Sequence, residues 1–292
     1  MKEHAQRFYS DAFMKNNRAK LLSEADAPTK ARLRSCAGPK ASSWLNCIPK
    51  IELFKLGPAD MRCCLRLRLG LPQLPIRTDV KCKCGKHPDA YGVHYLTCSH
   101  GNHLQTRHEL IVKAFHEMVQ ATSKHSQTKQ LEQTLHGFTG PKGSALVLDQ
   151  TISDWTDDHR DIGLDYAVCH PCATTYLSNS VDTDLGAADQ RGGQKTRKYQ
   201  PACRAHDIQF EPAILEVFGA MSRQAAFLVR RAASLLANEL PSGTVTTWTA
   251  DSFAAFHQQR ISIVLQRSNA KAIRLRAQRD FAASGFAGAS AD

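Results

Sequence analysis

The chain, 292 residues long, lacks any hydrophobic run near the roughly 18 residues that mark a membrane-spanning helix. Its first residues, MKEHAQRFYSDAF, have neither an apolar core nor a small-residue cleavage site, so we expect no secretory signal. No Walker loop, glycine-rich dinucleotide turn or Ser-His-Asp pattern is found. We therefore expect a nuclear or cytoplasmic protein that is neither secreted nor bound to a membrane.

Cysteine, by contrast, is abundant, with ten residues. Without a secretory signal we expect the thiols to stay reduced, and clustered reduced thiols favour metal binding over disulfides. The stretch CHPC at 169–172 lacks the context of a redox pair, and we interpret its cysteines as incidental.

The net charge of +11 is unevenly distributed along the chain. Residues 131–220 carry 7 Lys or Arg against 13 Asp or Glu, whereas the segments on both sides are basic. Basic flanks around an acidic centre suit a protein that binds a polyanion and holds a cation near it. A basic protein without such a partner remains the alternative interpretation.

The N-terminal 80 residues are predicted to be a basic, helical region, with a first helix near 4–22. The stretch IELFKLGPADMRCCLRLRLG, 51–70, predicts a short helix, a Gly-Pro break and a second helix that ends at Gly70. Because CLRLRLGL also alternates with period two, a strand remains the alternative there.

Residues 109–280 predict an α+β region. An amphipathic helix is expected at 104–121, then a helical segment with Glu132, and later helices at 194–206, 222–239 and 251–278. Strands are expected at 145–152, 162–168 and 210–219, the first two joined as a hairpin by the acidic turn SDWTDDHRD. The tail 281–292 is expected to be disordered.

A metal site is predicted in the segment 81–108. Zinc requires four soft or borderline ligands, and the candidates here are Cys82, Cys84, His94 and Cys98. Glycines between them allow tight turns, and four protein ligands imply a structural role. The C-x-C spacing is short for such a site, so His100, His103 and His108 remain alternative ligands, and reduced core cysteines with surface histidines remain the alternative to metal binding.

A second candidate site lies in the acidic centre. Asp149 and Asp165 are 16 residues apart, one near the end of each hairpin strand, and Glu132 can complete the acidic set. The lysines of the following helix are three residues apart on one face, with a tyrosine alongside: Lys195, Lys198 and Tyr199. Carboxylates that hold Mg²⁺ beside a lysine are typical of phosphodiester cleavage. A basic surface beside turn carboxylates is the alternative.

The cysteine-histidine segment resembles the region beyond the thumb of reverse transcriptases from non-LTR retrotransposons. In that family a Cys-Cys-His-Cys knuckle precedes a restriction-like endonuclease. The matching residues are Arg66-Leu67-Arg68-Leu69-Gly70, Cys82, Cys84, Gly85, Asp89, Gly92, His94, Leu96, Cys98, Arg107 and His108.

The resemblance continues through the acidic centre and covers roughly residues 50–280. It places Asp149, Asp165, the Lys195-Thr196-Arg197-Lys198-Tyr199 motif and Glu216-Val217-Phe218-Gly219 in the family's order. Two positions depart from it. Leu148 stands where the family has a proline, and Ala167 stands where ordinary PD-(D/E)XK nucleases have a lysine, which the helix lysines would have to replace.

The resemblance implies three regions and an activity. Residues 81–108 would form a zinc knuckle, and 109–280 a restriction-endonuclease-like mixed sheet flanked by helices. The implied activity is Mg²⁺- or Mn²⁺-dependent nicking of DNA, and the alternative is an inactive nucleic-acid-binding remnant. RNA, and the polymerase portion of the same element, remain open as partners, as does the oligomeric state. No YxDD motif is found, so no reverse transcription is expected. Phosphate contacts are expected from Arg66, Arg68, Arg107, Arg197, Arg260, Arg267, Lys271 and Arg274.

Overall fold

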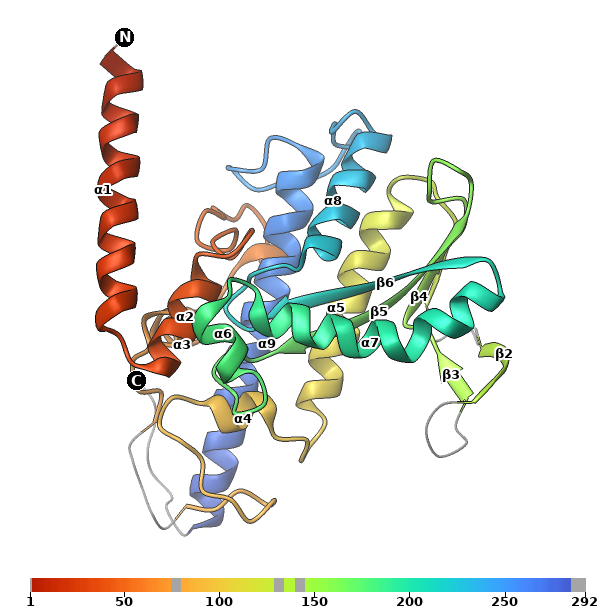
Figure 1. Ribbon diagram of the computed structural model, residues 1–292. Coiled ribbons are helices and arrows are strands. Elements are labelled where there is room, and N and C mark those ends of the chain that lie inside the picture. Colours follow the sequence, from red (N-terminus) through yellow and green to blue (C-terminus); the bar gives the residue numbers. More distant parts are fainter. Residues whose placement is uncertain (1, 75–79, 129–133, 140–144, 285–292) are drawn as a thin grey trace.

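The computed structural model describes residues 2–74, 80–128, 134–139 and 145–284. It confirms the α+β fold class, with a mixed four-stranded sheet flanked by helices (Figure 1). None of the described helices is long and apolar enough to cross a membrane. The elements in chain order are α1 (Lys2–Glu24), α2 (Ala27–Cys36), the 3-10 helix η1 (Glu52–Phe54), α3 (Pro58–Leu69), α4 (Val93–Thr97), α5 (His103–Gln120), β1 (Ser126–Thr128), β2 (Thr134–Thr139), β3 (Ala145–Val147), β4 (Gln150–Ile152), β5 (Asp161–Cys169), α6 (Leu177–Asp182), α7 (Gly186–Ala205), β6 (Ile208–Glu216), α8 (Arg223–Leu235) and α9 (Phe253–Ala283).

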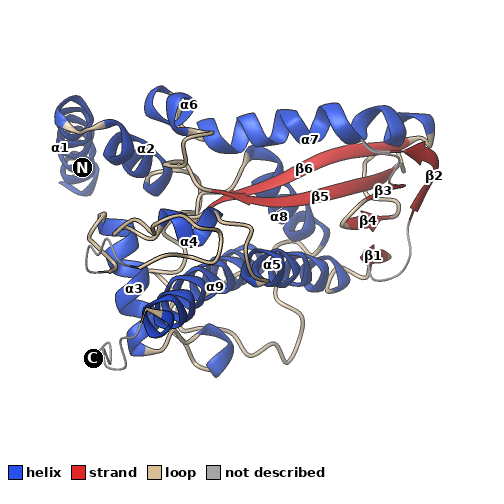
Figure 2. Ribbon diagram, turned by 90° about the horizontal axis from the view of Figure 1, so that it is seen from below, coloured by secondary structure: helices blue, strands red, loops and turns tan. Residues whose placement is uncertain are grey.

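The main sheet has the strand order β1-β4-β5-β6. Strands β4 and β5 form the predicted antiparallel hairpin, while β5 and β6 run parallel and are connected through α7. Helix α7 covers one face of the sheet, and α5, α8 and α9 cover the other (Figure 2). Because β5 is covered on both faces, its sequence is a nearly continuous apolar run rather than an alternating one.

The two faces of β5 take alternate side chains, as the period of a strand requires. Ile162, Leu164 and Tyr166 pack in the core formed with α5, α8 and α9. Ala167 and Cys169 pack in a second core with the N-terminal part of α7. Asp165 is two residues before Ala167, so its side chain lies on the same face of the sheet, toward α7.

A further core joins the N-terminal region to the rest of the chain. Phe54 and Leu67 pack there with Tyr95 and Leu96 of α4 and with Ile273 of α9. The three regions expected from the sequence therefore share this core, with α9 as their common partner.

Helix α3 resolves the ambiguity in CLRLRLGL in favour of a helix. Pro58 occupies the first turn, where it costs no hydrogen bond, and Gly70 ends the helix with a φ of 70°. The buried residues Cys63, Cys64 and Leu67 recur at helical spacing and outweigh the period-two alternation.

The structure differs from the predicted segments in several places. The strand expected at 145–152 is split, because β3 pairs with β2 whereas β4 pairs with β5. Residues 134–139, next to the helix expected around Glu132, form strand β2, and Glu132 itself lies outside the described residues. Helix α9 continues to Ala283, into the segment expected to be a disordered tail, of which residues 285–292 are not described.

Candidate metal centres

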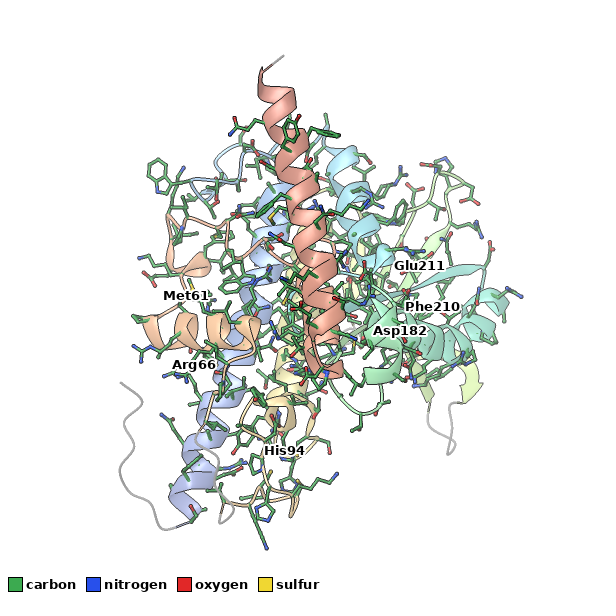
Figure 3. The ribbon with its side chains drawn as sticks, turned by 60° about the vertical axis from the view of Figure 1, so that its left-hand side comes forward. Met61, Arg66, His94, Asp182, Phe210 and Glu211 are labelled. Carbon is green, nitrogen blue, oxygen red and sulfur yellow. The ribbon has the colours of Figure 1, made fainter. Side chains whose placement is uncertain are left out.

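Four predicted ligands of the knuckle converge in space. The sulfur atoms of Cys82 and Cys98 are 4.0 Å apart, and the sulfur of Cys84 is 3.6 Å from Nε2 of His94, which Figure 3 labels. All four ligand atoms lie within 4.8 Å of one another. A tetrahedral zinc ion with ordinary Zn–S and Zn–N bonds sets its ligands about 3.5–3.8 Å apart. The cluster can therefore hold a metal ion, and its ligand set is consistent with zinc.

Backbone turns explain how a C-x-C spacing reaches this geometry. Gly85, with a φ of 85°, closes a turn in which its N–H donates to the Cys82 carbonyl at 2.8 Å. Asp89 then fixes the start of α4, because its carboxylate accepts from the backbone N–H groups of Val93 and His94. The sequence gives Asp89 no role beyond its place in the resemblance, and the structure identifies it as the cap that orients His94.

Arg276 of α9 supports the cluster from outside. Its guanidinium donates to the Cys82 sulfur at 3.1 Å and to the Tyr95 carbonyl at 3.0 Å. Burial raises the pKa of the Cys98 thiol, but hydrogen bonds from Arg276 and from the backbone of His100 outweigh it, so the net pKa is lowered. These hydrogen bonds favour the thiolate of Cys98, the form that binds metals, whereas burial raises the pKa of the Cys82 thiol.

Two of the alternative ligands are engaged elsewhere. Nε2 of His103 lies 3.0 Å from the Arg276 guanidinium. Nε2 of His108 contacts Asp149. Within the residues described, the only group of three or more potential metal ligands is Cys82, Cys84, His94 and Cys98.

Asp149 immediately precedes β4, and Asp165 lies on the neighbouring strand β5. The backbone N–H of Asp149 donates to the carbonyl of Leu164, the residue before Asp165, at 3.0 Å. Both side chains are buried. Burial raises the pKa of Asp165, the negative charge of Asp149 raises it further, and the Lys195 ammonium acts in the opposite direction.

Of the predicted lysines of α7, Lys195 contacts Asp165 and Lys198 contacts Tyr199. Nζ of Lys195 is 2.5 Å from Oδ2 of Asp165. Nζ of Lys198 donates to the Tyr199 hydroxyl at 3.2 Å and lies over its ring. Burial and the Asp165 charge together raise the pKa of Tyr199 well above its usual value, which keeps the hydroxyl protonated. A helix lysine thus stands beside Asp165, while Ala167 packs in the core.

Asp149 is held from the other side by a residue that the sequence did not assign to this site. Nε2 of His108, on α5, is 2.9 Å from Oδ2 of Asp149. The backbone N–H of Tyr166 donates to the same oxygen at 2.7 Å. In the sequence, His108 is a candidate only as an alternative zinc ligand and by its place in the resemblance, and neither indicates a contact with Asp149.

Glu216 does not join the carboxylates. It ends β6 beside Cys169, four residues along β5 from Asp165, and accepts from the backbone N–H of Ala188 at 3.2 Å. Burial raises its pKa, and it is only 1 % exposed. Glu216 therefore has a structural role, because it binds the backbone at the N-terminus of α7.

We expect Glu216→Gln to stabilise the protein at neutral pH and to leave metal binding unchanged. A buried acid with a raised pKa binds its proton more tightly in the folded state. The free energy of unfolding therefore falls as the pH rises from the pKa of Glu216 in the unfolded chain through its higher pKa in the folded protein. Melting temperatures of wild type and variant should converge near pH 4 and separate above it. A variant that is less stable than wild type at pH 7 would contradict this assignment.

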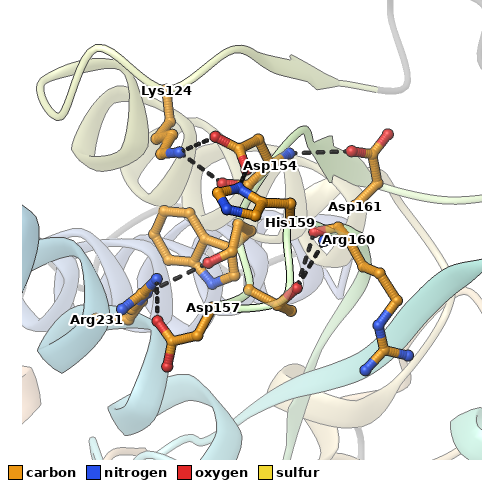
Figure 4. A network of polar contacts seen from close by, with 9 residues as sticks. Lys124, Asp154, Asp157, His159, Arg160, Asp161 and Arg231 are labelled. Atoms are coloured by element: carbon orange, nitrogen blue, oxygen red, sulfur yellow. Dashed lines mark hydrogen bonds and ion pairs between the residues drawn. The ribbon is translucent and has the colours of Figure 1, made fainter.

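The acidic turn between β4 and β5 forms its own surface network, shown in Figure 4. Asp154 pairs with Lys124 at 2.5 Å, and Asp157 pairs with Arg231 at 2.7 Å. These carboxylates are exposed, and their cations come from α8 and from the loop between α5 and β1, so they do not contribute to the Asp149–Asp165 site.

Five of the arginines expected to contact phosphate contact the protein instead. Arg107 is buried, and burial lowers its pKa to about 10. The others join elements: Arg68 binds the Cys36 and Ala41 carbonyls, Arg260 pairs with Glu117, Arg267 binds the carbonyls of Glu52, Leu53 and Lys55, and Arg274 pairs with Asp60. Arg260, Arg267 and Arg274 make these contacts because the basic face of α9 packs on α5, η1 and α3, whereas Arg68 and Arg107 lie on α3 and α5 themselves.

The remaining predicted cations stay at the surface. Arg197 and Lys198 are exposed on α7, and Lys271 is exposed on α9. Arg66, labelled in Figure 3, is exposed on α3, although its Nε donates to the Pro72 carbonyl at 2.8 Å.

No protein family model matches the chain, and no curated protein matches it.

Proposed function

We propose that the chain is a metal-dependent endonuclease module, related to those of non-LTR retrotransposons, that nicks DNA. Asp149 and Asp165 would bind Mg²⁺ or Mn²⁺, and Lys195 would stabilise the charge that develops on the phosphate. The observation that carries this proposal is the convergence of two buried carboxylates, one just before β4 and one on β5, with Lys195, which is 2.5 Å from Asp165. Buried carboxylates are costly unless they are paired, and a divalent cation would stabilise the two acids together with Lys195 and His108.

The cysteine-histidine cluster would have a structural role with zinc bound. All four positions are protein ligands, so no coordination site remains for a substrate. The bound ion would fix α4, whose Tyr95 and Leu96 pack against α9.

The test is nicking of supercoiled plasmid by the full chain with Mg²⁺ or Mn²⁺, with and without EDTA. DNA binding is measured beside it by filter retention. Metal-dependent nicking that EDTA abolishes supports the proposal, whereas binding without nicking under either metal contradicts it.

An inactive nucleic-acid-binding remnant is the second candidate function. Lys195 already balances the charge of Asp165, and among the described residues no third carboxylate joins the pair. Binding that survives in a protein unable to nick would establish this alternative.

Exposed basic residues on α7 should bind DNA phosphates. We expect Arg197→Ala to weaken DNA binding and to reduce the slope of log Kobs against log salt by about 1, because one phosphate contact is lost. Arg230→Ala is the matched control, since Arg230 is exposed on α8, which covers the opposite face of the sheet. If Arg197→Ala, Arg230→Ala and wild type have equal salt slopes, Arg197 does not contact the DNA.

A further inference from the structure

His108 fixes the orientation of the Asp149 carboxylate. A carboxylate only accepts hydrogen bonds, so the 2.9 Å contact makes Nε2 of His108 the donor. With the Tyr166 N–H, two donors bind Oδ2 of Asp149. Among the described residues none binds Oδ1, and this oxygen is the one available to a cation.

The residue before His108 is anchored in the knuckle. Arg107 donates to the Leu96 carbonyl at 3.2 Å and to Oδ1 of Asn269 at 2.9 Å. Leu96 lies on α4 between the ligands His94 and Cys98, and Asn269 in turn donates to the Val217 carbonyl at 2.9 Å. The first turns of α5 are therefore held by the knuckle on one side and by α9 on the other.

We propose that the adjacent residues Arg107 and His108 couple the zinc knuckle to the acidic metal site. Arg107 holds the start of α5 on the knuckle, and His108 positions Asp149 for a divalent cation. Both are positioning residues, since each acts through another group. The inference rests on the proposed function of the Asp149–Asp165 site and adds to it a dependence on a second centre.

Hydrogen-bond donors to a ligating carboxylate commonly change metal affinity by about 10–100-fold. We therefore expect His108→Ala to weaken Mn²⁺ binding in that range. His108→Gln retains an N–H donor of similar reach and should bind within about 5-fold of wild type. A direct metal ligand would not be replaced by glutamine, so failure of His108→Gln to restore binding overturns the positioning role.

The measurement is Mn²⁺ binding to the full, zinc-loaded chain, followed by loss of the free-ion electron paramagnetic resonance signal. Zinc loading keeps Mn²⁺ out of the knuckle. His116→Gln is the matched control, because His116 lies on the same helix and contacts Ser126 instead of the acidic site. Circular dichroism checks that each variant is folded. Equal affinity of wild type and His108→Ala overturns the inference.

The coupling is tested with Arg107→Lys, which keeps the charge but loses the fork that reaches both Leu96 and Asn269. It should weaken Mn²⁺ binding, speed hydrogen exchange at residues 103–108, and add no further loss in the His108→Ala background. Coupling through His108 is refuted if Arg107→Lys binds Mn²⁺ with wild-type affinity. It is also refuted if the loss of affinity in the double variant equals the product of the losses in the two single variants. If wild type binds no Mn²⁺, or if Asp165→Asn binds it equally well, the proposed function itself has failed.

Discussion

Replacing Asp165 with asparagine is expected to reduce metal-dependent nicking by about 10²–10³-fold while DNA binding is retained or strengthened. Asparagine keeps the size of the side chain but removes the charge that would hold the cation. The loss of a negative charge near a DNA-binding surface also reduces repulsion of phosphate. Nicking rates on supercoiled plasmid at saturating Mn²⁺, with filter binding beside them, measure both effects.

The control for Asp165→Asn is the same substitution at Asp157, in the acidic turn. Asp157 is exposed and pairs with Arg231 on α8, so Asp157→Asn should nick at the wild-type rate. If Asp165→Asn also nicks at that rate, the acidic site is not the catalytic centre. If it unfolds, Lys195→Met, which addresses the same centre from α7, provides the second test through its own loss of nicking.

Loss of the knuckle metal should have the largest effect on stability. We expect Cys98→Ser to release one zinc ion per chain and to lower the melting temperature by on the order of 10 °C, which corresponds to losing about 6 kcal/mol in a chain of this size. The effect reaches beyond the knuckle because Leu96 packs against α9.

Metal analysis and thermal melting of purified protein check this expectation. Cys47→Ser is the matched control, since Cys47 is a partly buried free cysteine outside the cluster. Wild-type zinc content in Cys98→Ser would mean that another residue supplies the fourth ligand, and an unchanged melting temperature would remove the structural role.

Local sequence patterns were sufficient for the elements that carry the two centres. Helical spacing identified α5, the apolar run with a flanking acidic turn identified the β4–β5 hairpin, and cysteine spacing identified the four clustered ligands. These patterns depend on residues close together in the sequence, so they can be recognised without knowing the tertiary structure.

Long-range packing set the features that could not be predicted. The basic face of α9 looked like a phosphate-binding surface, but Arg274 and Arg260 meet Asp60 and Glu117 from distant parts of the chain. Likewise nothing near His108 in sequence indicates Asp149, which is 41 residues away. The spacing of charged residues identifies the basic face of a helix, but it does not indicate which other element packs against that face.

Helix α9 has a consequence for how the protein reaches its folded state. Arg276 binds the carbonyl of Tyr95 across 181 residues of sequence, and Cys64 binds that of Gln266 across 202. During synthesis the N-terminal helices and the knuckle leave the ribosome long before this partner exists. Their apolar side chains have no α9 to pack against until it is synthesised, and contacts of such large sequence separation slow folding.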